Sequence, residues 1–252
     1  MGTPVIACDC PVCTSANPKN QRMRSSALIT AGDKKILIDC GPDFKAQAIK
    51  YGVNTLQGVI LTHAHNDHTA SLDELRVYCL RSGLPLPCLL SPETAEDLKT
   101  RFYYLFKEKE PYKGLLARLS MQPLEELRGE VDFLGLKIKY FSFYQLGMRV
   151  DGFRFGDVAY VSDIKEYPET IFEDLNGVRT LIMSALRFQP TPMHFNVDEA
   201  VEFAKKVGAE TTWFMHIAHE LDHDIGQAYV PGNIKLAYDG LKLDFKADIV
   251  DS

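Results

Sequence analysis

The sequence lacks the features of a membrane-spanning, secreted or nucleic-acid-coating protein. No apolar run approaches the roughly 18 residues of a transmembrane helix. The first ten residues, MGTPVIACDC, have no basic region followed by an apolar stretch, so we expect no secretory signal and a cytoplasmic location. The formal net charge of −6 argues against general nucleic-acid binding, but it leaves open a phosphate ligand held locally by metal.

Internal repeats, low-complexity tracts and linkers rich in proline, glycine or serine are also missing. The 252 residues are 46% hydrophobic and 25% charged, which suffices for one domain with a substantial core. We therefore expect a single domain over residues 1–252. The stretch 98–130 is aromatic, mixed in charge and weakly periodic, so we predict a cap or insertion there.

Short runs of aliphatic and β-branched residues alternate with helical patterns, which predicts an α/β fold. Helices are expected at 71–83 and 196–208. In the second helix, Asn196 is a suitable N-cap, Glu199 completes a capping box, and Gly208 ends the pattern. The strands are expected at 27–31, 35–39, 58–62, 136–143, 158–163 and 180–185.

Residues 62–68 read THAHNDH and directly follow the apolar run VIL. In an extended segment, side chains two positions apart face the same way, so His63 and His65 can reach one metal ion. Asp67 and His68 follow at a turn into a helix and point to a neighbouring position. Imidazole suits zinc, iron or manganese, and carboxylate favours a harder or mixed site. A polar loop with unrelated histidines is the alternative.

Cysteines cluster near the start of the chain in CDCPVC, which indicates thiolates in a reducing compartment. Cys8, Cys10 and Cys13 give three donors, and tetrahedral zinc needs a fourth. In an extended MHIAH, His216 and His219 face opposite sides, so one can enter an active site while the other completes the thiolate cluster. Metal-free cysteines are the alternative. The remaining thiols are expected as buried apolar residues, namely Cys40, Cys79 and Cys88.

The order H-x-H-x-D-H after a core strand resembles the metallo-β-lactamase superfamily. ILIDCGPDF (36–44), YVSD (160–163), FMHIAH (214–219) and KLAYDGL (235–241) resemble further motifs of that superfamily, in order along the chain. The extra motifs CDCPVC and RMRSS resemble the phosphoribosyl 1,2-cyclic phosphate phosphodiesterase family. The resemblance implies an αββα sandwich, with two mixed β-sheets flanked by helices.

The resemblance also assigns site residues and cofactors. One structural Zn²⁺ would be bound by Cys8, Cys10, Cys13 and His219. Two divalent ions, Mn²⁺ or Zn²⁺, would be bound by His63, His65, Asp67, His68, Asp163 and His216, with Asp163 bridging. The implied catalytic residues are Asp67, Asp163 and His194, of which His194 would protonate the leaving alkoxide. Asp39 and Asp239 would orient ligand imidazoles.

One ligand position departs from the family. Its first metal takes a further histidine from the middle of the chain, seven residues before the position of Gly152. That position is Gln145, and no histidine occurs between residues 69 and 193. Three readings of Gln145 stay open: it donates its amide oxygen to the metal, it hydrogen-bonds a water on the metal, or it touches no metal.

We therefore expect a metal-dependent hydrolase that opens a small cyclic phosphodiester by attack of a metal-bound hydroxide. The alternatives are a tRNA 3′-processing endonuclease, a thioester or lactone hydrolase, and a non-catalytic zinc-scaffolded binding protein. A small phosphorylated substrate is the expected partner, membrane binding is not expected, and a homodimer is left open. Relatives begin with a strand and a G-T-G-T-S turn before the segment matched by residues 2–4, so the first strand is expected to be missing or to lie upstream.

Overall fold

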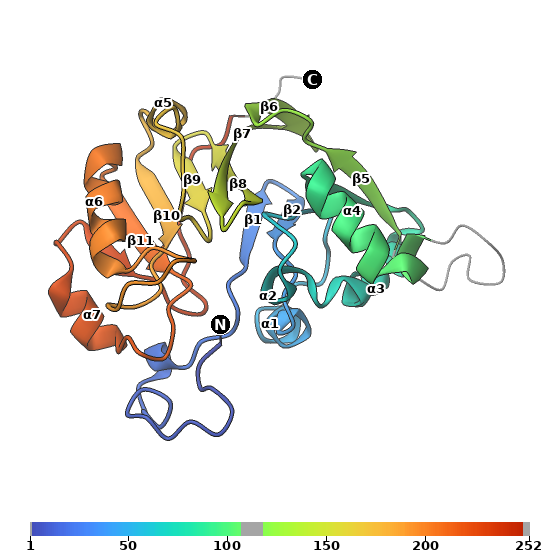
Figure 1. Cartoon of the computed structure of the whole chain (residues 1–252). Helices are drawn as coiled ribbons and strands as arrows, with labels where there is room; N and C mark the ends of the chain where they lie inside the picture. The colour runs from blue at the N-terminus through green and yellow to red at the C-terminus, as the bar shows by residue number, and fades with distance from the viewer. Residues whose placement is uncertain (1, 107–117, 249–252) are drawn as a thin grey trace. The chain divides into compact units, whose positions relative to one another are not determined.

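The computed structural model of the protein describes residues 2–106 and 118–248. The chain divides into two compact units, one formed by residues up to Met23 and from Leu127 onward, the other by Arg24–Glu126 (Figure 1). We call them the seven-stranded unit and the five-stranded unit, after their sheets. The prediction of a single domain stays a prediction. No helix in the described ranges is both long and apolar enough to cross a membrane.

The five-stranded unit holds a mixed sheet in the order β1-β2-β3-β4-β5. β1 pairs antiparallel with β2, and the other three pairings are parallel. Its strands are β1 (Ala27–Ala31), β2 (Lys34–Ile38), β3 (Gly58–Ile60), β4 (Leu86–Leu90) and β5 (Leu119–Pro123). Its helices are α1 (Phe44–Lys50), α2 (Asn66–Thr69), α3 (Arg76–Ser82) and α4 (Pro92–Arg101), with 3-10 turns η2 (Leu72–Leu75) and η3 (Tyr103–Phe106).

Aliphatic side chains on neighbouring strands form the core of this unit. Leu37, Val59 and Cys88 are aligned across β2, β3 and β4 and are almost fully buried. Phe44 of α1 and Leu98 of α4 belong to the same buried cluster. Burial of a leucine or valine side chain stabilises the fold by about 1.5–3 kcal/mol. This row therefore holds β3, the strand that the histidine motif follows, in its place in the sheet.

The seven-stranded unit holds a second mixed sheet, in the order β12-β11-β10-β9-β8-β7-β6. β9 to β12 are parallel, and β6 to β9 are antiparallel. Its strands are β6 (Arg128–Phe133), β7 (Leu136–Gln145), β8 (Met148–Phe155), β9 (Val158–Val161), β10 (Thr180–Ser184), β11 (Thr211–Met215) and β12 (Ile234–Leu236). Its helices are α5 (Ile171–Asp174), α6 (Val197–Val207) and α7 (His223–Tyr229), with the 3-10 turn η1 (Pro18–Asn20).

Helix α6 packs its apolar side on this sheet, where Phe203 joins Val161, Met183 and Phe214 in one buried cluster (Figure 1). The predicted capping box is confirmed: the Asn196 side chain accepts from the Glu199 N–H at 2.8 Å, and the Glu199 carboxylate accepts from the Asn196 N–H at 2.9 Å. Gly208 ends the helix with φ of +71°, a conformation that glycine adopts without strain.

The predicted fold class, two mixed β-sheets flanked by helices, is confirmed. The segment KLAYDGL (235–241), which resembles the closing strand of the superfamily, is a strand only as far as Leu236, where β12 ends. The prediction of a cap or insertion at 98–130 stays a prediction. β5 lies within this stretch and pairs with β4, and β6 begins in it at Arg128 and pairs with β7. Residues 107–117 of that stretch lie outside the described residues, as does Met1, so the prediction of a missing first strand stays a prediction.

The capping box generates a stability prediction. Asn196→Ala removes the acceptor for the Glu199 N–H and should lower the free energy of unfolding by about 0.5–2 kcal/mol. Urea denaturation of the purified protein measures it. Glu202→Ala, on the exposed side of the same helix, is the control and should stay within about 0.5 kcal/mol of the wild type. Equal losses in both variants would contradict the capping argument.

Candidate functional site

Three predicted site residues follow strands that run parallel to a neighbour, and all three have left-handed backbones. Asp39 follows β2 with φ of +62°, Asp163 follows β9 with +55°, and His216 follows β11 with +58°. Residues other than glycine rarely adopt this region, because it costs of order 1–3 kcal/mol and persists only where surrounding contacts enforce it. Such turns at the carboxyl ends of strands are typical of ligand sites, so these positions are candidates on backbone grounds alone.

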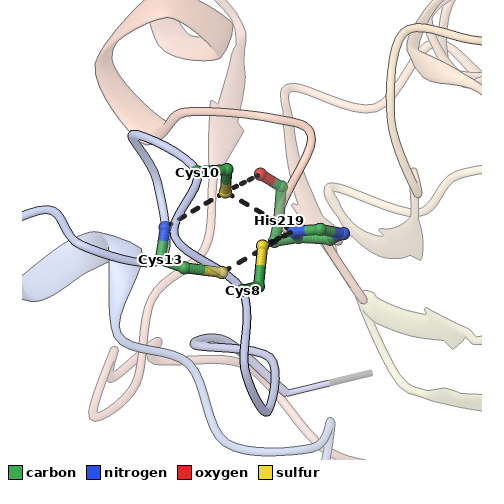
Figure 2. A group of neighbouring side chains, drawn as sticks. All are labelled: Cys8, Cys10, Cys13 and His219. Atoms are coloured by element: carbon green, nitrogen blue, oxygen red, sulfur yellow. Dashed lines mark hydrogen bonds between the residues drawn. The ribbon is translucent and has the colours of Figure 1, made fainter.

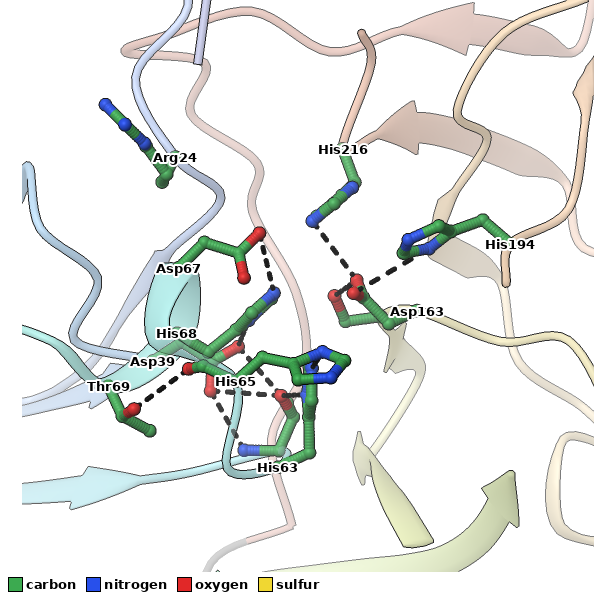
Figure 3. A network of polar contacts seen from close by, with 12 residues as sticks. Arg24, Asp39, His63, His65, Asp67, His68, Thr69, Asp163, His194 and His216 are labelled. Atoms are coloured by element: carbon green, nitrogen blue, oxygen red, sulfur yellow. Dashed lines mark hydrogen bonds and ion pairs between the residues drawn. The ribbon is translucent and has the colours of Figure 1, made fainter. Parts of the chain in front are cut away.

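In the five-stranded unit, the histidine motif begins two residues after β3. His63 Nε2 lies 3.1 Å from His65 Nδ1, as the alternation along an extended segment predicts (Figure 3). His63 is fully buried, and its Nδ1 lies 2.9 Å from Thr62 Oγ1. Two imidazoles bound to one zinc through bonds of about 2.0–2.1 Å would have their nitrogens roughly 3.4 Å apart. The observed separation therefore fits a shared ion.

Asp39 is the buried acceptor of this set. Its Oδ2 lies 2.7 Å from His68 Nδ1, and its Oδ1 accepts from the Thr62 N–H at 2.9 Å. Neither Asp39 nor His68 is exposed to solvent. A carboxylate that accepts one ring N–H fixes the tautomer, so that the other ring nitrogen, His68 Nε2, is presented as a metal donor. Asp67 Oδ2 lies 3.8 Å from that nitrogen.

Two features that hold the loop 64–69 were not predicted from the sequence. A Cβ on Gly41 would lie only 2.1 Å from the carbonyl oxygen of Asp67, so the turn after Asp39 can approach this loop only as glycine. Arg101 of α4 donates to the Ala64 carbonyl and, at 2.7 Å, to Asn66 Oδ1. Sequence gives no signal for Arg101, because it lies more than thirty residues beyond the loop that it contacts.

In the seven-stranded unit, Asp163, His194 and His216 converge, with one donor atom of each within 4.8 Å of the others (Figure 3). His216 Nε2 lies 3.4 Å from Asp163 Oδ1, and His194 Nδ1 lies 3.7 Å from Asp163 Oδ2. Ser162 Oγ donates to Asp163 Oδ1 at 2.7 Å. The Asp163 side chain is 1% exposed, and a buried carboxylate requires such partners or a cation.

Gln145 is at the end of β7 in this unit and is 1% exposed. Its Nε2 lies 3.1 Å from His194 Nδ1. Its Oε1 is buried and accepts no hydrogen bond from the described residues. Gln145, which stands where the family resemblance implies a histidine, is thus in contact with a predicted site residue, and whether it binds metal stays a prediction.

The predicted thiolate cluster converges on His219 within the seven-stranded unit (Figure 2). His219 Nδ1 lies 3.3 Å from Cys8 Sγ, 3.5 Å from Cys10 Sγ and 3.6 Å from Cys13 Sγ. A sulfur and a nitrogen on one tetrahedral zinc would lie roughly 3.5 Å apart, given bonds of about 2.3 and 2.0–2.1 Å. The spacing and chemistry of this quartet therefore fit zinc.

Within this quartet, hydrogen bonding favours the thiolate form of Cys10. The backbone N–H of Cys13, 3.4 Å from Cys10 Sγ, and then the His219 ring lower the pKa of Cys10 to about 6. Thiolate is the form that binds metal, so Cys10 is prepared for coordination near neutral pH.

The MHIAH segment was predicted to be extended, and this prediction is wrong. β11 ends at Met215, and the left-handed backbone of His216 turns the chain. The two imidazoles still lie in different clusters, His216 beside Asp163 and His219 among the thiols. The separation results from the turn and not from strand alternation.

Other expectations have mixed outcomes. His223 is 2% exposed, and its Nδ1 lies 2.9 Å from an Arg22 nitrogen, although the sequence gives no reason to expect this histidine away from the surface. Burial, followed by the charge of Arg22, lowers the pKa of His223 to about 4, so this imidazole is neutral. Asp239 accepts from the Met23 N–H at 3.0 Å, and its role beside ligand imidazoles stays a prediction. The thiols predicted to be buried are buried, namely Cys40, Cys79 and Cys88.

Comparisons with known proteins agree with this geometry. The family model described as "Beta-lactamase superfamily domain" matches residues 34–217, most of the chain. A solved structure of a new diphosphatase from the PhnP family is 33% identical, with a TM-score of 0.91 over 99% of this chain and 95% of that one. The chain therefore belongs to the metallo-β-lactamase superfamily, as predicted. Within it, the chain is close to the PhnP family.

Two curated relatives align over part of their length. An octanoyltransferase of Porphyromonas gingivalis is 30% identical over 259 residues, covering 96% of this chain and 49% of that protein. A ribonuclease Z of Mycolicibacterium gilvum is 35% identical over 86 residues, 31% of this chain and 30% of that one. The match thus spans about half the length of the octanoyltransferase and less than a third of the length of the ribonuclease Z. The family model and the diphosphatase structure support the hydrolase class, and the particular activity is a proposal.

The quartet generates a metal prediction. Cys10→Ser should release about one zinc per chain and lower the melting temperature, since the ion would lose one of four donors. Atomic emission analysis and thermal denaturation measure the two effects. Cys88→Ala is the control, because that buried thiol lies in the other unit, and it should keep the full zinc content. Full zinc content in Cys10→Ser would exclude the quartet as a zinc site.

Proposed function

We propose that the protein is a metal-dependent phosphodiesterase that acts on a small phosphorylated molecule, with a cyclic phosphate as the leading substrate. The observation that carries the proposal is the pair of buried donor sets, one in each unit, whose imidazoles and carboxylates have metal-ligand separations. The 33% identity to a diphosphatase over almost the whole chain supports phosphorus chemistry.

The proposed ligands are His63, His65, Asp67, His68, Asp163 and His216, and the proposed ions are Mn²⁺ or Zn²⁺. When bound, divalent ions supply Lewis acidity toward phosphoryl oxygens and a nucleophile near neutral pH. The protein residues orient these donors. Asp39 holds the tautomer of His68, and Ser162 holds one oxygen of Asp163.

Charge and donor chemistry favour a small phosphate ester. A net charge of −6 repels polyanions at long range, so a phosphate must gain its binding energy close to the ions. Imidazole and carboxylate sets of this kind hold divalent cations, which then attract a phosphoryl group locally. The structural zinc, a cytoplasmic location and a homodimer stay predictions that accompany this proposal.

A hydrolysis assay tests the proposal. Wild-type protein with added Mn²⁺ or Zn²⁺ should cleave bis(p-nitrophenyl) phosphate, a ribosyl cyclic phosphate or a diphosphate diester. Asp163→Ala should abolish the activity, because the family resemblance makes this carboxylate a ligand to both ions. The matched control is Asp244→Ala, which removes an exposed carboxylate and should keep wild-type turnover.

Two outcomes would contradict the proposal. Undiminished turnover by Asp163→Ala would show that the reaction does not use the predicted centre. Absence of turnover on all three substrates by fully metallated wild type would favour a non-catalytic zinc-scaffolded binding protein.

The ribonuclease Z matches favour one second candidate, tRNA 3′-end processing. The match covers less than a third of this chain, and the negative net charge disfavours an RNA-gripping surface. A precursor tRNA carrying a 3′ trailer separates the two candidates. Trailer removal at a rate above that of cyclic phosphate opening would establish the nuclease and exclude the small-molecule activity as the main one.

A further inference from the structure

The seven-stranded unit contains few histidines that could bind a metal ion. Its histidines are His194, His216, His219 and His223, since none occurs between residues 69 and 193. His219 lies among the thiols, and His223 lies against Arg22. Among the described residues of this unit, His194 and His216 are therefore the imidazoles that lie beside Asp163.

We propose that His194 is a metal ligand, together with Asp163 and His216, and that Gln145 positions it. His194 thereby supplies the imidazole that the family resemblance implies for position 145. The inference rests on the proposed function for the presence of a metal centre, and it replaces the sequence-based assignment of His194 as a proton donor.

The donor separations support coordination. Asp163 Oδ1 lies 3.4 Å from His216 Nε2, and Asp163 Oδ2 lies 3.7 Å from His194 Nδ1. Nitrogen and oxygen donors of one tetrahedral ion would lie roughly 3.4 Å apart, given bonds of about 2.0–2.2 Å. The two imidazole rings lie side by side with centroids 5.1 Å apart and planes at 25° (Figure 3). Two imidazoles and a carboxylate are a common ligand set for zinc, iron and manganese.

The backbone next to His194 is held by two hydrogen bonds, which limits the positions that its ring can reach. The Phe195 N–H donates to the Ile164 carbonyl at 3.1 Å, and the Phe195 carbonyl accepts from the Leu186 N–H at 3.0 Å. The Phe195 ring is buried in a cluster with Tyr167 and Phe203. The His194 side chain itself is 12% exposed, which limits competition by water.

Gln145 is fixed against the same loop. Tyr144 and Glu166 exchange backbone hydrogen bonds of 2.7 and 2.9 Å, which tie the end of β7 to the segment just after Asp163. The buried Gln145 Nε2 lies 3.1 Å from His194 Nδ1 and 3.3 Å from His194 Nε2, while Oε1 accepts no hydrogen bond from the described part of the chain. A half-turn of the amide would let Oε1 accept the Nε2–H of His194 and leave Nδ1, which faces Asp163, as the metal donor. Ligand histidines usually donate their second N–H to such an oxygen, which fixes the tautomer.

A manganese titration tests the ligand assignment. Electron paramagnetic resonance measures the free Mn²⁺. Manganese is chosen because it prefers nitrogen and oxygen donors, so that binding to the thiolate quartet does not contribute to the titration. His194→Ala should weaken one manganese site by about 100-fold or more, beyond the scale of changes next to ligands. Met193→Ala, in the same loop and partly exposed, is the matched control and should bind as wild type does. Circular dichroism and melting temperature verify folding of each variant.

Position 145 gives the second arm. Gln145→Leu should weaken the same site by about 10- to 100-fold, whereas Gln145→Glu, which keeps an acceptor, should retain it. The double variant His194→Ala with Gln145→His has an imidazole at position 145, where the family resemblance implies one. Its manganese affinity should recover. Failure of this rescue would overturn the statement that His194 replaces the ligand at 145.

The outcomes separate this inference from the proposed function. Unchanged manganese binding in folded His194→Ala, with lost hydrolysis and a lost alkaline limb in the pH–rate profile, would overturn the ligand assignment and restore the proton donor. Weakened binding in a protein whose wild type cleaves no diester would support the ligand assignment while the function fails. A wild type that binds no manganese would overturn both.

Discussion

Burial of imidazole and carboxylate groups is the constraint on which the functional part of this molecule depends. Transfer of such groups out of water costs several kcal/mol per ion in real proteins unless they are paired, hydrogen-bonded or bound to a cation. Asp39, His68 and Asp163 are all nearly inaccessible to solvent. Each therefore needs its neighbours. The polar partners Thr62 and Ser162 recover part of this cost, and a bound cation would recover more.

The parallel strands determine where these groups lie. β2 and β9 each end in a turn with a left-handed carboxylate residue, and β11 ends in a left-handed histidine. A regular strand would send alternate side chains to opposite faces, but a left-handed residue redirects the next step of the chain. The hydrophobic clusters behind the strands hold these turns in place. The geometry of the candidate site and the packing of the core are thus two results of the same strand pairings.

Local patterns were predictable, and contacts across long stretches of sequence were not. The capping box of α6 and the shared direction of His63 and His65 involve residues two or three positions apart, where backbone periodicity suffices. The buried His223 contacts Arg22, which lies 201 positions away in the sequence. The Gln145–His194 contact depends equally on the tertiary fold. Periodicity carries no information about such pairs, which only packing of the whole unit creates.

The thiol and imidazole quartet also has a consequence for chain entropy. Cys8 and His219 are separated by 211 positions, so an ion bound by both would close a loop of almost the whole chain. Closure of a loop this long removes roughly 5 kcal/mol of conformational freedom from the unfolded ensemble, by the relation used for covalent cross-links. The ion would thus act as a reversible cross-link that a chelator opens. The ion would also restrict the backbone at His219, three residues beyond His216. Binding of the ion among the thiols would therefore reduce the motion of His216 beside Asp163.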